Sequence, residues 1–171
     1  MRSRSISETI DKLTNSIEIV ATGKSVPTEF YRVHIKDIPH INQFTWDFDW
    51  DKEIRNKTNE VYKLCIKGNP EIIQGLIALR NEMGIVVVDL VESAKFNRGK
   101  HKIYNGVAGN LFAFGCFFSK KEGFYGIIAF TAKTALVQHY ISVLGAKVIY
   151  SNRMRIEPAE AEILISKYFS L

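Results

Sequence analysis

The sequence contains little cysteine, and none of it is arranged to bind a metal ion or to form a disulfide framework. Cys65 and Cys116 are the only cysteines among 171 residues, no Cys-x-x-Cys pair occurs, and neither cysteine has a histidine at ligand spacing. The histidines also lack paired spacing, and they are His34, His40, His101 and His139. We therefore expect two reduced thiols in the core and no metal site.

Long apolar stretches are absent as well. The longest run, residues 111–118, is much shorter than the roughly 18–20 apolar residues of a membrane-spanning helix, so it predicts a buried helix. The first four residues are partly basic, but a polar run at 5–9 stands where a secretory signal needs apolar residues. These features predict a cytoplasmic protein with no membrane contact.

Several catalytic signatures are also missing. The sequence has no Gly-x-Ser-x-Gly nucleophile motif, no Walker phosphate-binding loop and no longer dinucleotide-binding fingerprint. Internal repeats, low-complexity segments and linkers are not found either. The chain is therefore expected to form a single domain over residues 1–171, outside the hydrolase, P-loop and Rossmann classes.

The composition is that of a globular protein with a mild basic excess. Hydrophobic residues make up 46% and charged residues 24% of the chain, and the formal net charge is +5. The charge has two readings: an ordinary soluble surface, or a surface that attracts phosphates on a coenzyme or a nucleic acid. The densest basic cluster is Arg98-Gly99-Lys100-His101-Lys102.

Hydrophobic periodicity and turn residues divide the chain into strands followed by alternating helices and strands. A short N-terminal helix is expected from Ile6, Ile10, Leu13 and Ile17. Strands are expected over 16–21, 28–35, 61–66, 72–79, 85–91, 126–131, 146–150 and 153–156, and helices over 106–119, 134–144 and 158–168. Residues 37–60 are expected to be mostly irregular. This order predicts an α/β fold with a mixed, mostly antiparallel central sheet flanked by helices.

Three aromatic residues alternate with aspartates inside the irregular region. Trp46, Phe48 and Trp50 have the period of a strand. Such a pattern favours packing of one face, or of a lid, against the core. An aromatic wall of a substrate site is the alternative.

A glycine-rich turn before a helix is the strongest candidate for a binding site. The run Gly106-Val107-Ala108-Gly109-Asn110-Leu111 would expose backbone N–H groups that have no partner within the helix. The helix dipole and the small side chains would let a pyrophosphate approach these groups. By itself, a short glycine- and alanine-rich helix start is also common for purely structural reasons.

This turn and the elements around it resemble the GNAT N-acetyltransferases. Their signature, Gln/Arg-x-x-Gly-x-Gly/Ala, lies between the fourth strand and a long helix, and Gly106-Val107-Ala108 matches its second half, with Ile103 at the Gln/Arg position. A strand and a helix with Tyr140 then precede Leu144-Gly145-Ala146, as in that family. The likeness covers about residues 60–150 and implies a GNAT-like fold that takes acetyl-coenzyme A (acetyl-CoA) as acyl donor.

The resemblance also implies where acetyl-CoA would lie. In the family, the fourth and fifth strands splay apart and the pantetheine arm occupies the gap, which corresponds here to the backbone of Val91, Glu92 and Ser93. The pyrophosphate would contact Gly106, Val107, Ala108, Gly109, Asn110 and Leu111. Lys102, from the basic cluster, and Lys133 are expected as further cofactor contacts. Thr134, beside Lys133, is expected to cap the helix over 134–144.

Two residues are candidates for the chemistry that the resemblance implies. Glu92 ends an apolar strand, and strict alternation would put it on the face of Val88 and Leu90, where a partly desolvated carboxylate could act as general base. A strand-end glutamate that faces water or pairs with a lysine is the alternative. Tyr140 is the candidate general acid, or else a core tyrosine whose hydroxyl has a partner. Asp89 is expected on the other face.

Together these features predict an N-acetyltransferase that acts on a primary amine of an unidentified small molecule or protein. A coenzyme A-binding module without catalysis is one alternative. An acetyltransferase for aminoacyl-tRNA, which would bind nucleic acid, is another and is less favoured. The resemblance is also compatible with a homodimer.

Overall fold

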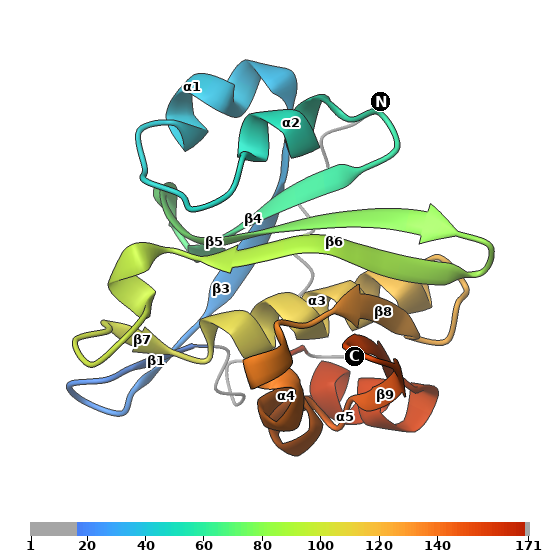
Figure 1. Cartoon of the computed structure of the whole chain (residues 1–171). Helices are drawn as coiled ribbons and strands as arrows, with labels where there is room; N and C mark the ends of the chain where they lie inside the picture. The colour runs from blue at the N-terminus through green and yellow to red at the C-terminus, as the bar shows by residue number, and fades with distance from the viewer. Residues whose placement is uncertain (1–16, 170–171) are drawn as a thin grey trace.

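A computed structural model describes residues 17–169 of the chain. The N-terminal helix expected from Ile6, Ile10 and Leu13 lies outside this range, and Ile17 begins a strand instead. A central sheet separates two layers of helices (Figure 1). None of the helices within 17–169 combines the length and the apolar character needed to cross a bilayer.

The central sheet has seven strands in the order β3-β4-β5-β6-β8-β10-β9. Their bounds are β3 (Thr28–Val33), β4 (Glu60–Ile66), β5 (Asn69–Glu82), β6 (Ile85–Ser93), β8 (Ile128–Thr131), β9 (Lys147–Tyr150) and β10 (Arg153–Ile156). All neighbours pair antiparallel except β6 and β8, which are parallel. The predicted fold class, a mixed and mostly antiparallel sheet with flanking helices, is confirmed.

The helices are unequal on the two faces of the sheet. One face carries α1 (Ile38–Ile41) and α2 (Trp50–Arg55), and the other carries α3 (Val107–Lys121), α4 (Val137–Leu144) and α5 (Pro158–Tyr168) (Figure 1). Residues 37–60, predicted to be mostly irregular, thus contain two short helices. The aromatic alternation at 46–50 is not a strand, because a loop leads directly into α2.

Helix α3 forms the centre of the larger core. Its residues 110–119 are all buried, because the sheet covers one side and α5 the other. Phe114 stacks on Phe30 of β3 at 4.0 Å between ring centroids. At Gly109 a Cβ atom would come 2.6 Å from the Tyr168 hydroxyl, so this glycine permits the close packing of α3 on α5. The predicted buried helix over 111–118 is confirmed.

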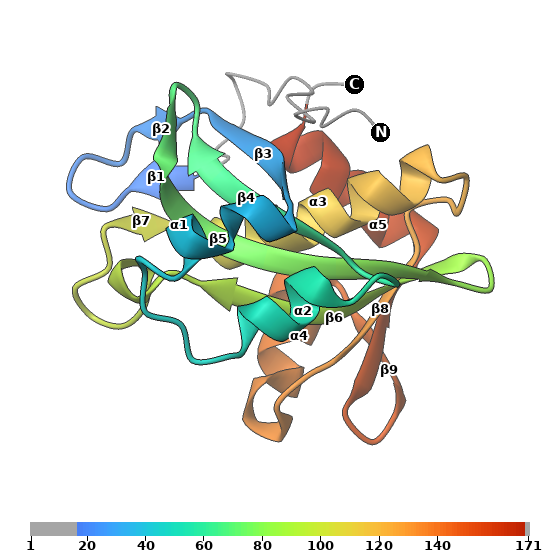
Figure 2. The same ribbon diagram turned by 90° about the horizontal axis from the view of Figure 1, so that it is seen from above.

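A second sheet of three strands lies beside the N-terminus of α3 (Figure 2). It has the order β2-β1-β7, formed by β1 (Ile17–Ile19), β2 (Ser25–Val26) and β7 (Tyr104–Asn105). The sequence predicts a strand near β1 but not β7, which has two residues and lies in the connection from β6 to α3. This pairing ties that connection to the N-terminal hairpin, since Val20 N–H also donates to the Ile103 carbonyl at 3.0 Å.

A β-bulge in the middle of β6 changes which face its later residues occupy. Ala78 pairs with Leu90 and Leu79 with Val88, so Asp89 is an extra residue without its own partner on β5. Val88 packs in the α3-side core, whereas Leu90 packs in the cluster under α1 and α2. The alternation predicted from the sequence is therefore wrong at this point: Leu90 and Glu92 share a face, and Val88 lies on the opposite one.

Candidate active site

The strands β6 and β8 separate after a short parallel ladder. They pair only at Val86–Ile128, Val87–Ala129 and Val88–Phe130. Beyond Val88, β6 continues to Ser93, and residues 89–93 have no partner in β8. One edge of β6 is therefore free to form hydrogen bonds over these residues.

Each strand is drawn towards its other neighbour at the point of separation. The end of β6 stays on β5 through the pairs Leu76–Glu92 and Gly75–Ser93. The chain after β8 is held by Asn152 instead, because Ala132 N–H donates to the Asn152 carbonyl at 2.9 Å and the Asn152 amide donates to the Ala132 carbonyl at 2.8 Å. The divergence is thus fixed by hydrogen bonds on both sides.

A cleft of about 280 Å³ occupies the gap between the two strands. Its walls come from the end of β6, the first turns of α3 and the segment from β8 to α4, together with Asp47, Phe48 and Arg98. The lining includes Val91, Glu92 and Ser93 of β6, Ala108 and Phe112 of α3, and Ala132, Lys133 and Tyr140 on the β8 side. Six residues predicted for the site from the sequence therefore lie around one cleft, and they are Val91, Glu92, Ser93, Ala108, Lys133 and Tyr140.

The N-terminus of α3 opens towards this cleft. Gly106 caps the helix with φ +86°, in the left-handed region where other residues are strained. Ala108 is exposed and lines the cleft. The N–H groups of Val107, Ala108 and Gly109, in the first turn, have no acceptor within the helix. The turn is therefore suited to hold an anion.

Two residues predicted for the pyrophosphate site have other tasks. The Asn110 N–H donates to the Gly106 carbonyl at 2.9 Å, so it already belongs to the helical hydrogen bonds. The Asn110 side chain is buried and donates to Thr28 Oγ1 at 3.2 Å, and Leu111 is fully buried in the core. The prediction is therefore corrected to the first turn, because residues from the second turn onward use their N–H groups inside the helix.

The close approach of α3 to the sheet depends on Gly75 in β5. A Cβ atom there would lie 2.8 Å from Leu111 Cδ1 and 3.2 Å from Val107 Cγ1. Glycine at this position lets the first turn of α3 pack against the end of β6. The sequence gives no local sign of this requirement, because it arises from a contact between distant segments.

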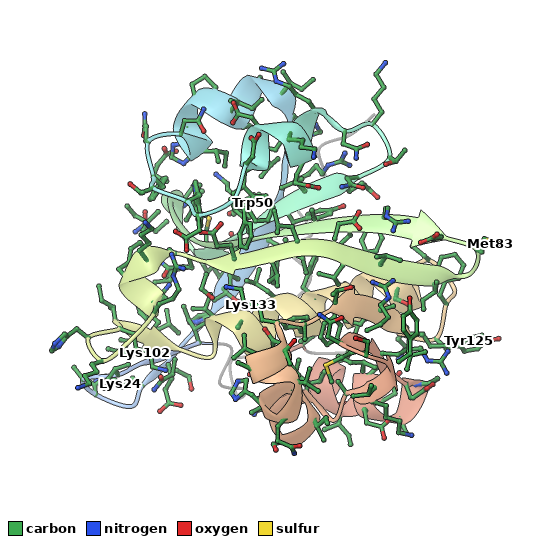
Figure 3. The ribbon with its side chains drawn as sticks, viewed as in Figure 1. Lys24, Trp50, Met83, Lys102, Tyr125 and Lys133 are labelled. Atoms are coloured by element: carbon green, nitrogen blue, oxygen red, sulfur yellow. The ribbon has the colours of Figure 1, made fainter. Side chains whose placement is uncertain are left out.

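The basic residues near the cleft fall into separate groups. Lys133 lines the cleft and precedes a 3-10 turn at Thr134–Leu136 that leads into α4. Lys102 is exposed on the connection that carries β7, out towards the small sheet, while Lys133 lies nearer the centre of the molecule (Figure 3). The predicted Thr134 cap is wrong, because α4 begins only at Val137 and its N-cap residue is Leu136.

The Glu92 carboxylate is buried and well satisfied by hydrogen bonds. Its side chain is 3% exposed. It accepts hydrogen bonds from the backbone N–H of Asp47 at 2.7 Å, from the backbone N–H of Phe48 at 3.2 Å and from Trp50 Nε1 at 2.9 Å. Neither form of the alternative, a glutamate facing water or paired with a lysine, is found.

An arginine links Glu92 to the same segment. Arg98 donates to Asp47 Oδ2 at 2.7 Å and its guanidinium lies 3.7 Å from Glu92 Oε2. Lys95 lies 3.4 Å from Asp47 Oδ1. The Arg98 hydrogen bond, with a smaller contribution from Lys95, lowers the pKa of Asp47 below its ordinary value. Arg98 is thus engaged with carboxylates, although the sequence grouped it with lysines expected to contact phosphates.

Tyr140 lies in the cleft wall opposite β6. Its ring makes edge contacts with Phe112 and Phe130, with centroids 5.3 and 5.5 Å apart. Within residues 17–169 no acceptor bonds its hydroxyl, so it is not the core tyrosine with a partnered hydroxyl that was the alternative. Burial raises the pKa of Tyr140 above its ordinary value, which keeps the phenol protonated at neutral pH.

The three predicted aromatic residues separate into different roles. Trp50 is buried, and Trp46 is partly buried with its indole N–H donating to the Ile41 carbonyl at 3.0 Å. Phe48 is 43% exposed and lines the cleft. The tryptophans therefore pack as predicted, while Phe48 borders the cleft, and its role as a wall of a substrate site stays a prediction.

The cleft also includes residues that the sequence did not predict there. Asp47 reaches it from a segment far away in the chain, beside Phe48, which the aromatic pattern had singled out. Asp89, at the bulge, lines the cleft but its carboxylate binds Arg80 Nε at 2.8 Å, which favours a structural role. Among residues 17–169 no three His, Cys, Asp or Glu side chains are grouped as metal ligands.

Comparison with known proteins gives matches by structure and none by sequence. No protein-family model and no curated protein matches the sequence. The crystal structure of AtaTR bound with acetyl-CoA superposes with a TM-score of 0.61 and 14% identity, over 81% of this chain and 98% of that one. The PaiA N-acetyltransferase of Thermoplasma acidophilum, in complex with coenzyme A, gives a TM-score of 0.57 and 11% identity, over 76% and 98%.

A third solved structure has a similar fold. An aminoglycoside acetyltransferase from an uncultured soil metagenomic sample gives a TM-score of 0.50 and 12% identity, over 72% of this chain and 92% of that one. At these identities the likeness is one of fold. The chain has the fold of the GNAT acetyltransferases, with the strand order, the splayed pair and the long helix after it.

Proposed function

We propose that this protein is an N-acetyltransferase that transfers an acetyl group from acetyl-CoA to a primary amine. One observation carries the proposal: the cleft between the separated ends of β6 and β8 is lined by Ala108 in the first turn of α3, where the helical N–H groups have no acceptor within the helix. Solved structures that share the fold were determined with acetyl-CoA or coenzyme A.

The residues present fit acetyl-CoA in shape and polarity. The free edge of β6 at Val91, Glu92 and Ser93 offers backbone groups to the amides of the pantetheine arm, much as an added strand would. The first turn of α3, with Gly106 and Ala108 small and exposed, offers N–H groups to the pyrophosphate. Lys133 at the cleft and Lys102 on the neighbouring connection add positive charge for the phosphates.

The chemistry is a direct transfer. The lone pair of a neutral amine attacks the thioester carbonyl, the C–N bond forms and the C–S bond breaks. The amine loses its proton to water at the cleft; the sequence predicts Glu92 as the base behind that water, whereas the three hydrogen bonds from residues 47–50 to its carboxylate favour a different role. The leaving sulfur gains a proton, for which Tyr140 is the proposed donor, because Tyr140 lines the cleft and burial raises the pKa of its hydroxyl, which stays protonated at neutral pH.

Binding of acetyl-CoA by isothermal calorimetry tests the proposal. Ala108→Glu introduces a carboxylate beside the proposed pyrophosphate position on an exposed helical residue. Charge repulsion there should weaken binding at least about 10-fold, since 1.4 kcal/mol corresponds to that factor. Calorimetry on the unaltered protein should give a dissociation constant in the micromolar range.

A matched control is available in α5. Ala159 is also exposed and also the second residue of its helix, so Ala159→Glu makes the same change at another helix start. It should leave acetyl-CoA binding unchanged. Equal loss in both variants, or no binding by the unaltered protein at millimolar acetyl-CoA, would refute the assignment.

Thioester turnover separates an enzyme from a binding module of the same fold. Release of free thiol that depends on an added primary amine supports the transferase. Tight acetyl-CoA binding without such release from a broad set of amines would instead support the non-catalytic alternative. Acetylation of aminoacyl-tRNA with a steep dependence on salt would identify nucleic acid as the acceptor.

A further inference from the structure

The segment of residues 46–50 is attached to the cleft by one side chain. Glu92 accepts hydrogen bonds from Asp47 N–H, Phe48 N–H and Trp50 Nε1, which are separated from it by 45, 44 and 42 residues in sequence. Both carboxylate oxygens are used. A buried carboxylate needs such partners to offset its desolvation, so the donors and the acceptor hold each other in place.

The attached segment forms part of the cleft wall. Phe48 borders the cleft and also a second hollow of about 430 Å³ on its other side, whose lining further includes Phe44, Trp46 and Trp50. Trp50 is 2% exposed and lies above the sheet, so the segment is anchored at that end (Figure 3). The phenyl ring of Phe48 is therefore the apolar surface that an acceptor entering from this side would meet.

We propose that Glu92 is a positioning residue, which fixes the 46–50 segment so that Phe48 forms the acceptor-side wall and selects acceptors with an apolar or aromatic group near the amine. Arg98 completes the attachment, because it bridges Glu92 and Asp47. The proposal rests on the transferase function for its account of the acceptor, but the attachment itself does not depend on that function.

The contacts of Glu92 favour positioning over proton transfer. Three of the roughly four lone-pair positions of the carboxylate already accept hydrogen bonds, and a proton received at the remaining one would weaken the charge-assisted bonds that hold the segment. Two of these donors are backbone groups and cannot turn away without moving the chain. Glu92 therefore serves best as the acceptor that holds the segment.

Tryptophan fluorescence tests the attachment without any acceptor. The chain has two tryptophans, Trp46 and Trp50, and both belong to the 46–50 segment. Glu92→Gln keeps the size of the side chain but places an amide donor against N–H donors. Acrylamide quenching should rise at least about twofold in this variant because the segment opens locally. Glu82→Gln, an exposed glutamate at the end of β5, is the matched control and should not change quenching.

Kinetics with phenethylamine as the acceptor then test the role of the wall. In Glu92→Gln and in Phe48→Ala the KM for phenethylamine should rise about 10-fold, which corresponds to 1.4 kcal/mol of lost binding. The KM for acetyl-CoA and the shape of the pH profile of kcat should stay as in the unaltered protein. A general base would behave differently: kcat would fall by about 10²- to 10⁴-fold and the acid limb of the profile would disappear.

The outcomes distinguish this proposal from the proposed function. Unchanged quenching in Glu92→Gln overturns the attachment, and a loss confined to kcat overturns the positioning role. If Glu92→Gln does not fold, Trp50→Phe removes one of the three bonds and should raise the quenching of Trp46. If the unaltered protein acetylates no amine, the transferase function fails, while the quenching result still decides whether Glu92 holds the segment.

Discussion

The two faces of the central sheet are closed by different kinds of interaction. On the α3 face, a continuous core runs from Phe30 across α3 to α5 and is almost entirely apolar. On the face of α1 and α2, a much smaller apolar cluster around Trp50 and Ile73 is joined by the buried carboxylate of Glu92. The acetyl-CoA side of the proposed site is thus built on apolar packing, and its acceptor side on a few hydrogen bonds.

This difference fits the separate tasks proposed for the two sides. An apolar, close-packed core holds α3 and its N–H groups in one position, as recognition of an invariant pyrophosphate requires. A loop held by few polar bonds can change its sequence and shape at little cost to the core. Acceptor specificity could then vary while the fold and the donor site remain.

The largest effect is expected from truncation of an aromatic residue on each face. Phe114 is fully buried and stacks on Phe30, so Phe114→Ala should lower the free energy of unfolding by about 3–5 kcal/mol. Phe44 is partly buried on the other face, so its side chain removes less apolar area from water on folding. Phe44→Ala should therefore lower the free energy of unfolding by only about 1–2 kcal/mol. Urea unfolding at neutral pH measures both. Equal losses would show that the two faces are not built differently.

A smaller, purely chemical effect is expected from Tyr140→Phe. The Tyr140 ring packs on Phe112 and Phe130, and the substitution keeps these contacts while removing the hydroxyl. Stability should therefore change by less than about 0.5 kcal/mol, whereas kcat with acetyl-CoA and phenethylamine should fall about 100-fold through loss of the proton donor. Urea unfolding and steady-state rates give the two numbers. Full activity in this variant would remove Tyr140 from the mechanism.

The contrast between the faces also explains what the sequence could predict. The α3 face could be anticipated because its signals are local: a glycine-rich turn, an apolar run and a period that changes from strand to helix. Gly106 could be placed at the start of α3 and Ala108 in its first turn for the same reason. The succession of strands and helices along the chain followed from the turns between them, whereas their order in the sheet was not predicted.

The other face depends on contacts between distant segments, which periodicity does not encode. The three donors to Glu92 lie more than forty residues away, as their separations of 42 to 45 residues show. The bulge at Asp89 reversed the expected face of Val88 relative to Leu90, and a bulge has no fixed sequence sign. The need for glycine at position 75 arises from its contact with α3, and strand β7 forms because it pairs with β1. Both depend on segments that are distant in the sequence.

The last prediction uses pH to test how dry the α3 face is. Burial raises the pKa of the Cys116 thiol on α3 far above its ordinary value of 9.0, and it also raises those of Tyr140 and Tyr168 on the same face. A thiol that stays protonated when folded but ionises when unfolded stabilises the protein fully below pH 9. Above pH 9 the unfolded chain gains the advantage of ionisation, so stability falls with rising pH.

Each such thiol should contribute a loss of about 1.4 kcal/mol per pH unit above 9, because one pKa unit corresponds to that energy. Cys116→Ala should therefore reduce the drop in the free energy of unfolding between pH 7.5 and pH 10.5 by about 2 kcal/mol, as measured with urea under reducing conditions. The comparison is made within each variant, so the small cavity left by the alanine cancels. An unchanged drop would mean that the α3 face admits water to Cys116, and the picture of a dry apolar platform under the acetyl-CoA site would have to be abandoned.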